Sequence, residues 1–237
     1  MAGDDRASVP PATWAATAGR KREWTGTADG QGAVVNPPVW RASTVLYPSI
    51  AAMEEAATDS DRRLFYGRKG TPTTWALREA LTGLEPGAAG TMLFPSGVAA
   101  LTAAILSVAG AGDHVLVTDS AYDPTSAFLF GMARRLGIEA EAYPPDIGGD
   151  IAGLFRANTR LVIVESPGSL SFEVQDVPAI AAAANARGIA TLLDNTWAAS
   201  HFFKGIAAGC TMVMQALTKS VGGHSDAMMG SVSAAPD

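Results

Sequence analysis

Short apolar runs alternate with amphipathic stretches along the chain from about residue 71. Apolar residues that recur every three to four positions are typical of helices, whereas brief apolar runs bounded by glycine, proline or polar residues are typical of strands. The helical pattern predicts helices at residues 73–84, 97–109, 123–136, 149–156 and 177–187. The apolar runs predict strands at residues 90–94, 113–118, 139–143, 160–165, 190–194, 211–216 and 228–233.

Several of the expected strands are apolar at consecutive positions, as in residues 115–117 and 161–164. Such strands are typical of parallel sheets whose two faces are both covered by helices. The alternation of strands and helices therefore predicts a layered α/β domain with a mostly parallel sheet. No convincing helix separates the last two strands, so we expect one antiparallel strand there.

The first 60 residues or so follow a different pattern. Pro10-Pro11, Pro37-Pro38 and Pro48, together with several glycines, interrupt any long periodic stretch. We expect an extended arm with one helix near residues 48–58, and such arms bury too little surface to be stable alone. The expected organisation is an arm at residues 1–60 that contacts a neighbouring subunit, followed by a large domain at residues 61–237.

Composition narrows the classes of function. The chain has 237 residues with a net charge of −6, and its few basic residues do not form the stripe that nucleic-acid binding requires. Cys210 is the single cysteine, which excludes an internal disulfide and a cysteine-based zinc site. The three histidines are scattered, so we expect no metal site. Neither a signal peptide nor a membrane span is recognisable, and we expect a cytoplasmic protein.

Polar residues gather where the expected strands end. In open α/β sheets, ligands bind beyond the carboxyl ends of the strands. Five strand ends carry residues suited to chemistry, at residues 94–97, 118–122, 165–167, 194–196 and 218–219. We therefore expect one site along this edge of the sheet.

Two of these strand ends have alternative interpretations from the residues alone. Ser96-Gly97 leaves a strand and opens a helix, which is typical of a phosphate site but also of an ordinary serine N-cap. Tyr122 begins the next helix, where its ring either stacks on a planar cofactor or packs against the protein.

Two charged residues at the same edge also each have a cofactor-binding and a structural interpretation. Asp194 ends a strand, where a carboxylate either keeps a pyridine nitrogen protonated or closes a local turn. Lys219 follows an apolar strand, where a lysine either forms an imine or begins an exposed turn. We expect His224, in the next turn, to be a turn or packing histidine rather than a base. No G-x-S-x-G or G-x-G-x-x-G motif supports a hydrolase or a dinucleotide site.

Taken together, these segments resemble the pyridoxal-phosphate enzymes of cysteine and methionine metabolism, which have fold type I. The resemblance covers residues 33–234 without a large gap. It implies a three-layer α/β/α domain with a mostly parallel seven-stranded sheet, and pyridoxal 5'-phosphate as the cofactor. The matching segments are residues 35–38, 41–44, 66–68, 94–97, 121–122, 165–169, 194–197, 218–219 and 223–226.

The resemblance also implies roles for individual residues. Lys219 would carry the cofactor as a Schiff base and move protons, Asp194 would face the pyridine nitrogen, and Tyr122 would stack on the ring. Tyr66 and Arg68 would reach the phosphate of a neighbouring subunit in a homodimer or homotetramer. The remaining cofactor-binding residues would be Ser96, Gly97, Val98, Thr196 and Thr218.

Local differences within the family favour its β-lyase branch. Gly168-Ser169, Trp197 and Ala216 match β-lyases where γ-acting members usually differ. The expected reaction cleaves cystathionine, or a related cysteine S-conjugate, to a thiol, pyruvate and ammonia. The alternatives are a γ-synthase or γ-lyase, and a non-catalytic remnant that binds the cofactor.

The sequence stops at Asp237, soon after Lys219. Members of the family continue into a smaller C-terminal domain that supplies the arginine for the substrate carboxylate. This domain is missing, so we expect a truncated chain with little turnover of its own.

Overall fold

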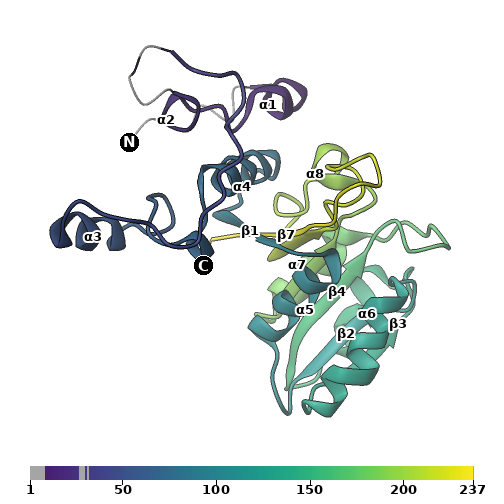
Figure 1. Ribbon diagram of the computed structural model, residues 1–237. Helices are drawn as coiled ribbons and strands as arrows, with labels where there is room; N and C mark the ends of the chain where they lie inside the picture. The colour runs from purple at the N-terminus through teal and green to yellow at the C-terminus, as the bar shows by residue number, and fades with distance from the viewer. Residues whose placement is uncertain (1–8, 27–29, 31, 237) are drawn as a thin grey trace. The chain divides into compact units, whose positions relative to one another are not determined.

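The computed structural model describes residues 9–26, 30 and 32–236 (Figure 1). The chain divides into two compact units, Met1–Gly83 and Leu84–Asp237. This division follows packing within the chain, whereas the expected boundary near residue 60 concerned contact with another subunit and stays a prediction.

The first unit contains short helices joined by extended segments. The helix expected near residues 48–58 is present as α3, and the Ser49 side chain caps it by accepting a hydrogen bond from Ala52 N. Two helices near the N-terminus were not predicted. The first of them begins at Pro11, a position where proline favours a helix start rather than an interruption. The elements are α1 (Pro11–Thr17), α2 (Arg22–Thr25), α3 (Ile50–Ala57), the 3₁₀ helix η2 (Gly67–Lys69) and α4 (Pro72–Leu84).

Trp14 anchors α1 within the first unit. Its indole Nε1 donates a hydrogen bond of 2.9 Å to the carbonyl of Ala80 in α4. A Cβ atom on Gly83 would lie 2.2 Å from the Trp14 ring, so the absence of a side chain at this position gives the indole its place. Tertiary packing thus stabilises a helix too short to be stable alone.

The second unit is built on a seven-stranded sheet. Its strand order is β1-β7-β6-β5-β4-β2-β3, and β7 runs antiparallel to both of its neighbours. All seven expected strands are present, and the expected antiparallel strand is β7. The strands are β1 (Gly90–Phe94), β2 (His114–Thr118), β3 (Glu139–Tyr143), β4 (Thr159–Glu165), β5 (Ala190–Asp194), β6 (Met212–Gln215) and β7 (Gly230–Ala234).

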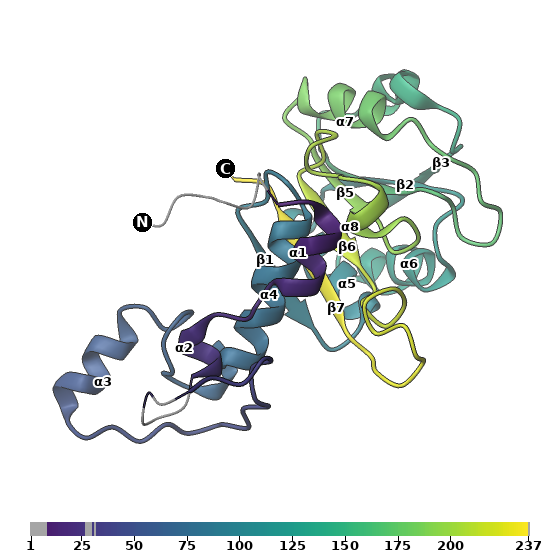
Figure 2. The ribbon, with the colours of Figure 1, turned by 90° about the horizontal axis from the view of Figure 1, so that it is seen from above.

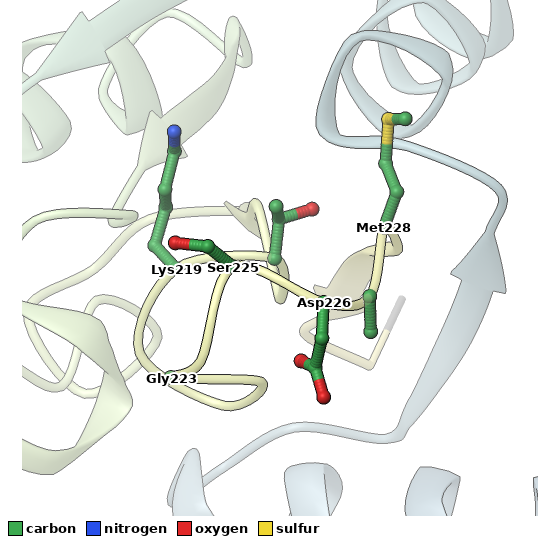
Figure 3. A pocket seen from close by; sticks show the side chains of 7 residues that line it. Lys219, Gly223, Ser225, Asp226 and Met228 are labelled. Carbon is green, nitrogen blue, oxygen red and sulfur yellow. The ribbon is translucent and has the colours of Figure 1, made fainter.

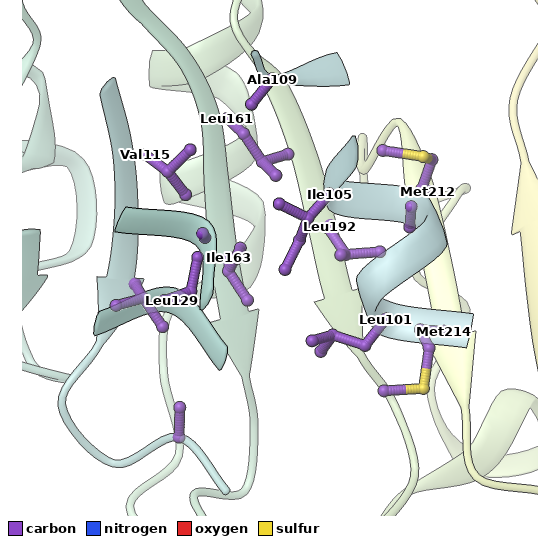
Figure 4. Close-up of a cluster of buried hydrophobic side chains, with 14 of the residues drawn as sticks. Leu101, Ile105, Ala109, Val115, Leu129, Leu161, Ile163, Leu192, Met212 and Met214 are labelled. Atoms are coloured by element: carbon purple, nitrogen blue, oxygen red, sulfur yellow. The ribbon is translucent and has the colours of Figure 1, made fainter. Parts of the chain in front are cut away.

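Helices cover both faces of this sheet, as the three-layer expectation required. In β4, Leu161 and Ile163 enter one core while Val162 and Val164 enter the other. The first core, shown in Figure 4, packs under α5 (Gly97–Val108) and the segment after β2. The second core packs under α7 (Val177–Asn185), and Figure 2 shows α7 on the side of the strands opposite α5 and α6 (Asp123–Ala127).

Two connections differ from the expected helices, and one short helix was not expected. The helix expected at residues 123–136 is α6 followed by the π-helix η3 (Phe128–Ala133), with the flexible Gly131 in its interior. The segment expected as a helix at residues 149–156 is the 3₁₀ helix η4 (Gly148–Leu154), where three glycines disfavour a regular α-helix. A further short helix, α8 (Ala199–Phe202), follows β5. Within the described part of the chain, no helix is long and apolar enough to cross a membrane.

Candidate active site

A cavity of about 700 Å³ opens at the carboxyl ends of β4, β5 and β6 in the second unit. Its position is the one expected for a ligand site in an open α/β sheet. Residues far apart in the sequence line it. They are Ser96, Gly97, Val98, Leu101, Tyr122, Thr125, Glu165, Ser169, Leu170, Phe172, Asp194, Thr196, Trp197, Met214, Ala216, Thr218, Lys219, Ser220 and Met228.

Lys219 lies at the base of a loop that follows β6. Hydrogen bonds from Thr218 N to Met229 O and from Met229 N to Thr218 Oγ1 close this loop, at 3.3 and 3.1 Å. A second cavity, of about 510 Å³, lies beside the same lysine. In Figure 3 the amine of Lys219 extends away from Asp226. No described residue accepts a hydrogen bond from Lys219 Nζ, which leaves the amine available to a ligand.

Two carboxyl groups, a half-buried Glu165 and a buried Asp194, line the larger cavity side by side. Glu165 and Asp194 are register partners at the ends of β4 and β5. Burial raises the pKa of Glu165 to about 8, and the neighbouring Asp194 carboxyl contributes to the same shift. Burial also raises the pKa of Asp194, although hydrogen bonds from Thr196 oppose this effect. The two raised pKa values favour a shared proton between these carboxyls over two full negative charges in the cavity.

Asp194 closes a local turn, which is one of its two expected roles, while the role opposite a ring nitrogen stays a prediction. Its Oδ1 accepts a hydrogen bond of 3.0 Å from Thr196 N, which closes a local turn. The Thr196 side chain also lowers the pKa of Asp194 by hydrogen bonding. The Asp194 carboxyl lines the cavity, where it can meet a cationic or N–H group of a ligand. Thr196 Oγ1 in turn accepts from Ala216 N at 2.8 Å, which fixes the turn against the end of β6.

The N-terminus of α5 forms another wall. Ser96 is its N-cap, and its Oγ accepts a hydrogen bond of 3.1 Å from Ala99 N. The amides of Gly97 and Val98 have no hydrogen-bond partner among the described residues, as expected for the first turn of a helix. A Cβ on Gly97 would lie 2.7 Å from the Ala216 Cβ, so glycine permits α5 to approach β6 closely. This helix end is suited to an anionic group such as phosphate.

Aromatic side chains border the cavity. Tyr122 is 48% exposed and precedes α6, and its backbone N donates to Glu165 Oε2 at 2.7 Å. Phe172 and Trp197 meet edge to face with ring centroids 6.0 Å apart. Both of these rings are more than half exposed, so they form an apolar rim rather than part of the core.

Eight of the ten residues named from the sequence line this cavity: Ser96, Gly97, Val98, Tyr122, Asp194, Thr196, Thr218 and Lys219. Their individual roles stay predictions. His224 has a local contact, with Nδ1 2.7 Å from Gly222 O, as a turn histidine would.

Tyr66 and Arg68 belong to the first unit and are exposed there. Tyr66 forms a backbone bridge with Thr44, and Gly67 N donates to Ser43 O at 2.7 Å. The two sequence segments that contain these residues are thus neighbours in the fold. Neither the Tyr66 hydroxyl nor the Arg68 guanidinium has a hydrogen-bond partner among the described residues.

Glu165 is the main residue of the cavity to which the sequence pattern assigned no role of its own. The pattern places it at a strand end, yet nothing there distinguishes it from a residue that merely ends a strand. Its register with Asp194 was the missing information, because strand order cannot be read from one sequence. Phe172 and Trp197 lie in the segments that follow β4 and β5, and the apolar pattern does not predict the course of such segments.

The arrangement fits the cofactor that the resemblance implied. Pyridoxal 5'-phosphate needs an amine for its aldehyde, a carboxylate for its ring nitrogen and donors for its phosphate. Lys219, Asp194 and the α5 N-terminus offer these groups around one cavity. The chain's own geometry therefore supports the cofactor.

Comparisons with known proteins agree with this geometry. Residues 19–236 match the model of the family described as Cys/Met metabolism PLP-dependent enzyme. The chain is 50% identical over 200 residues to a putative cystathionine beta-lyase of Rhizobium johnstonii, covering 84% of this chain and 49% of the relative. It is 42% identical over 216 residues to cystathionine beta-lyase MetC of Escherichia coli, covering 90% and 53% respectively.

A solved structure has a similar fold. Cystathionine gamma-lyase CalE6 from Micromonospora echinospora superposes with a TM-score of 0.81 at 30% identity, covering 96% of this chain and 56% of that one. The chain thus spans about half the length of the relatives it matches. Because the family model matches nearly all of the sequence, the chain belongs to the pyridoxal-phosphate-dependent enzymes of cysteine and methionine metabolism, with fold type I.

Proposed function

We propose that the protein is a carbon–sulfur β-lyase that cleaves cystathionine, or a related cysteine S-conjugate, to a thiol, pyruvate and ammonia. The observation that carries this proposal is the convergence of Lys219, Asp194 and the N-terminus of α5 on one cavity. The names of the most similar relatives support the β-lyase reaction over others of the family.

Each wall of the cavity has a part in holding the cofactor. Lys219 Nζ would bind the aldehyde carbon, and Asp194 Oδ2 would face the ring nitrogen. The Gly97 and Val98 amides, with the hydroxyls of Ser96 and Thr218, would surround the phosphate. Tyr122 would cover one face of the ring, with Thr196 holding the Asp194 carboxyl in place.

When bound, the cofactor withdraws electrons from the substrate's α-carbon. The Lys219 amine would remove the α-proton of the substrate. Loss of the thiolate from the β-carbon then breaks the carbon–sulfur bond, and a proton returns to the sulfur. Water converts the remaining three-carbon fragment to pyruvate and ammonia, so the atoms balance with one water consumed. Asp194 contributes by keeping a negative charge opposite the ring nitrogen.

The choice between β- and γ-elimination depends on the side-chain end of the cavity. Ser169, Trp197 and Ala216, at positions where γ-acting relatives usually differ, all line it. A γ-lyase or γ-synthase is the second candidate, because a γ-lyase structure shares the fold at 30% identity. A remnant that binds the cofactor without turnover is the third.

Product analysis separates these candidates. The chain would be loaded with pyridoxal 5'-phosphate, freed of excess cofactor and incubated with L-cystathionine. Formation of pyruvate supports the β-lyase, whereas 2-oxobutyrate would establish γ-elimination. Cofactor binding without either product would support the remnant. A Lys219→Ala chain is the matched control for background reaction.

We infer that the active assembly is a homodimer or homotetramer with shared sites. The exposed and unpartnered side chains of Tyr66 and Arg68 support this, since a phosphate from a neighbouring subunit would satisfy them. A small sulfur amino acid is the substrate in this account, with no nucleic-acid or membrane partner. A cytoplasmic location is consistent with the single buried cysteine, Cys210.

A further inference from the structure

Glu165 is the ionisable side chain of the cavity that the proposed reaction does not use. It ends β4 and lines the cavity wall. Its Oε2 accepts a hydrogen bond of 2.7 Å from the backbone N of Tyr122. Tyr122 immediately precedes α6, so this bond fixes the point at which the chain turns from β2 into that helix.

Glu165 and Asp194 also lie on the same face of the sheet. They are register partners, and the residues two positions earlier, Ile163 and Leu192, both enter the first core. Side chains at paired positions of adjacent strands lie about 5 Å apart at their origins. Two carboxylates at this spacing, one of them buried, repel each other strongly, so one of them tends to hold a proton.

We propose that Glu165 is a positioning residue that holds the Tyr122 turn with one carboxyl oxygen and retains a proton, leaving Asp194 as the single negative charge of the pair. The inference rests on the proposed function in one respect, namely that Asp194 faces the ring nitrogen of the cofactor. A neutral Glu165 would then not compete with Asp194 for that ring, while Tyr122 stays in place to cover it.

The surroundings of the two carboxyls decide which of them holds the proton. Burial and the nearby Asp194 raise the pKa of Glu165 to about 8, and the single bond from Tyr122 N opposes this only in part. Burial raises the pKa of Asp194 as well, but the side chain and the backbone of Thr196 both lower it by hydrogen bonding. Among the described residues that line the cavity, the other ionisable groups are Lys219 and Tyr122. A cationic ring nitrogen beside Asp194 would add to its preference for the charged form.

Two variants separate the hydrogen bond to Tyr122 N from the ability of residue 165 to ionise. Glu165→Gln keeps an oxygen acceptor for Tyr122 N and has the shape of the neutral acid, whereas Glu165→Ala removes the acceptor. We expect amide hydrogen exchange at Tyr122, measured by NMR on the cofactor-free chain, to accelerate about tenfold in Glu165→Ala and to stay within about twofold in Glu165→Gln. Exchange at Tyr122 that is unchanged in Glu165→Ala would overturn the positioning role.

A titration of the Glu165 carboxyl tests whether it retains a proton. Carbon-13 NMR of labelled glutamate carboxyls in the cofactor-free chain should show one group with a midpoint near pH 8, which disappears in Glu165→Gln. Glu173→Gln, which changes an exposed carboxylate in a neighbouring loop, should leave this titration in place. A Glu165 carboxyl that titrates near its ordinary value would overturn the second half of the proposal.

Cofactor affinity then tests the consequence for the site. Because glutamine resembles the neutral acid, we expect Glu165→Gln to bind pyridoxal 5'-phosphate within about threefold of the parent at pH 7. A loss of tenfold or more in a variant with an unchanged circular dichroism spectrum would show that Glu165 acts as an anion. Failure of the proposed reaction itself would leave the exchange and titration results unaffected, since both are measured without cofactor or substrate.

Discussion

At the scale of single residues, the site depends on where buried charges lie. Strand-end positions for Asp194 and Lys219 were predictable, because polar residues that end apolar strands gather at one edge of a parallel sheet. The partnership of Asp194 with Glu165 was not, because it depends on β4 and β5 being neighbours in register. The apolar pattern along a single sequence carries no information on the pairing of β4 with β5.

The raised pKa of Glu165 has a consequence for stability. Its folded value of about 8 lies above the ordinary value of 4.5, so the folded chain binds more protons than the unfolded chain between these values. The contribution of Glu165 to stability is therefore complete below about pH 4.5 and is lost as the pH rises through 8. We expect the free energy of unfolding of the cofactor-free chain to fall over this interval, by at most about 1.4 kcal/mol per pH unit from this group.

Urea unfolding at several pH values, with Glu165→Gln beside the parent, measures this effect. The free energy of unfolding should fall less steeply with rising pH in Glu165→Gln, because the variant lacks this one titrating proton. Parallel pH profiles for the two proteins would mean that Glu165 titrates at the same pH in the folded and unfolded chains.

Asp194→Asn tests the charge opposite the ring. The amide oxygen can still accept from Thr196 N, so the turn and the fold should persist. We expect turnover of cystathionine to fall by about 10² to 10³, because a preorganised charge is lost from the transition state. Pyruvate formation is the assay, and Glu173→Gln serves as the variant that removes an exposed charge nearby. Asp194→Asn with parental turnover would exclude this role.

At the scale of elements, apolar periodicity predicted all seven strands and the antiparallel course of β7. The irregular helices η3 and η4 were missed as such, since glycines in their interior alter the hydrogen bonding without altering the apolar pattern. Helix α1 was missed because Pro11 was interpreted as an interruption, although proline is accepted in a first turn.

The contact between α5 and β6 gives a prediction for packing. Gly97→Ala would place a methyl group 2.7 Å from the Ala216 Cβ, closer than two non-bonded carbon atoms can approach. We expect a loss of about 1–3 kcal/mol in the free energy of unfolding, measured with urea. The double variant Gly97→Ala with Ala216→Gly should recover much of this loss, because it removes the opposing methyl group. A double variant no more stable than Gly97→Ala would show that a different contact limits position 97.

At the scale of the whole molecule, the shared-site proposal predicts complementation between subunits. Arg68→Ala and Lys219→Ala should each abolish or greatly reduce activity when alone. If Arg68 serves the site of a neighbouring subunit, a mixed assembly contains some sites with both native residues. Unfolding and refolding an equal mixture should then restore activity at about a quarter of the native sites.

Pyruvate formation from cystathionine by the mixture, compared with each variant treated in the same way, is the measurement. A mixture as inactive as its components would mean that Arg68 and Lys219 of one subunit act in the same site. Lys69→Ala, beside Arg68 in η2, is a suitable control for loss of positive charge in this segment.

The covalent attachment of the cofactor to Lys219 is the central claim, and borohydride trapping tests it most directly. The chain is incubated with pyridoxal 5'-phosphate, reduced with borohydride and digested, and the modified peptide is located by mass spectrometry. We predict a stable adduct on Lys219 and none on Lys204, whose amine already donates to the carbonyls of Leu84 and Ser200. An adduct on another lysine, or one that persists in Lys219→Ala, would contradict the account.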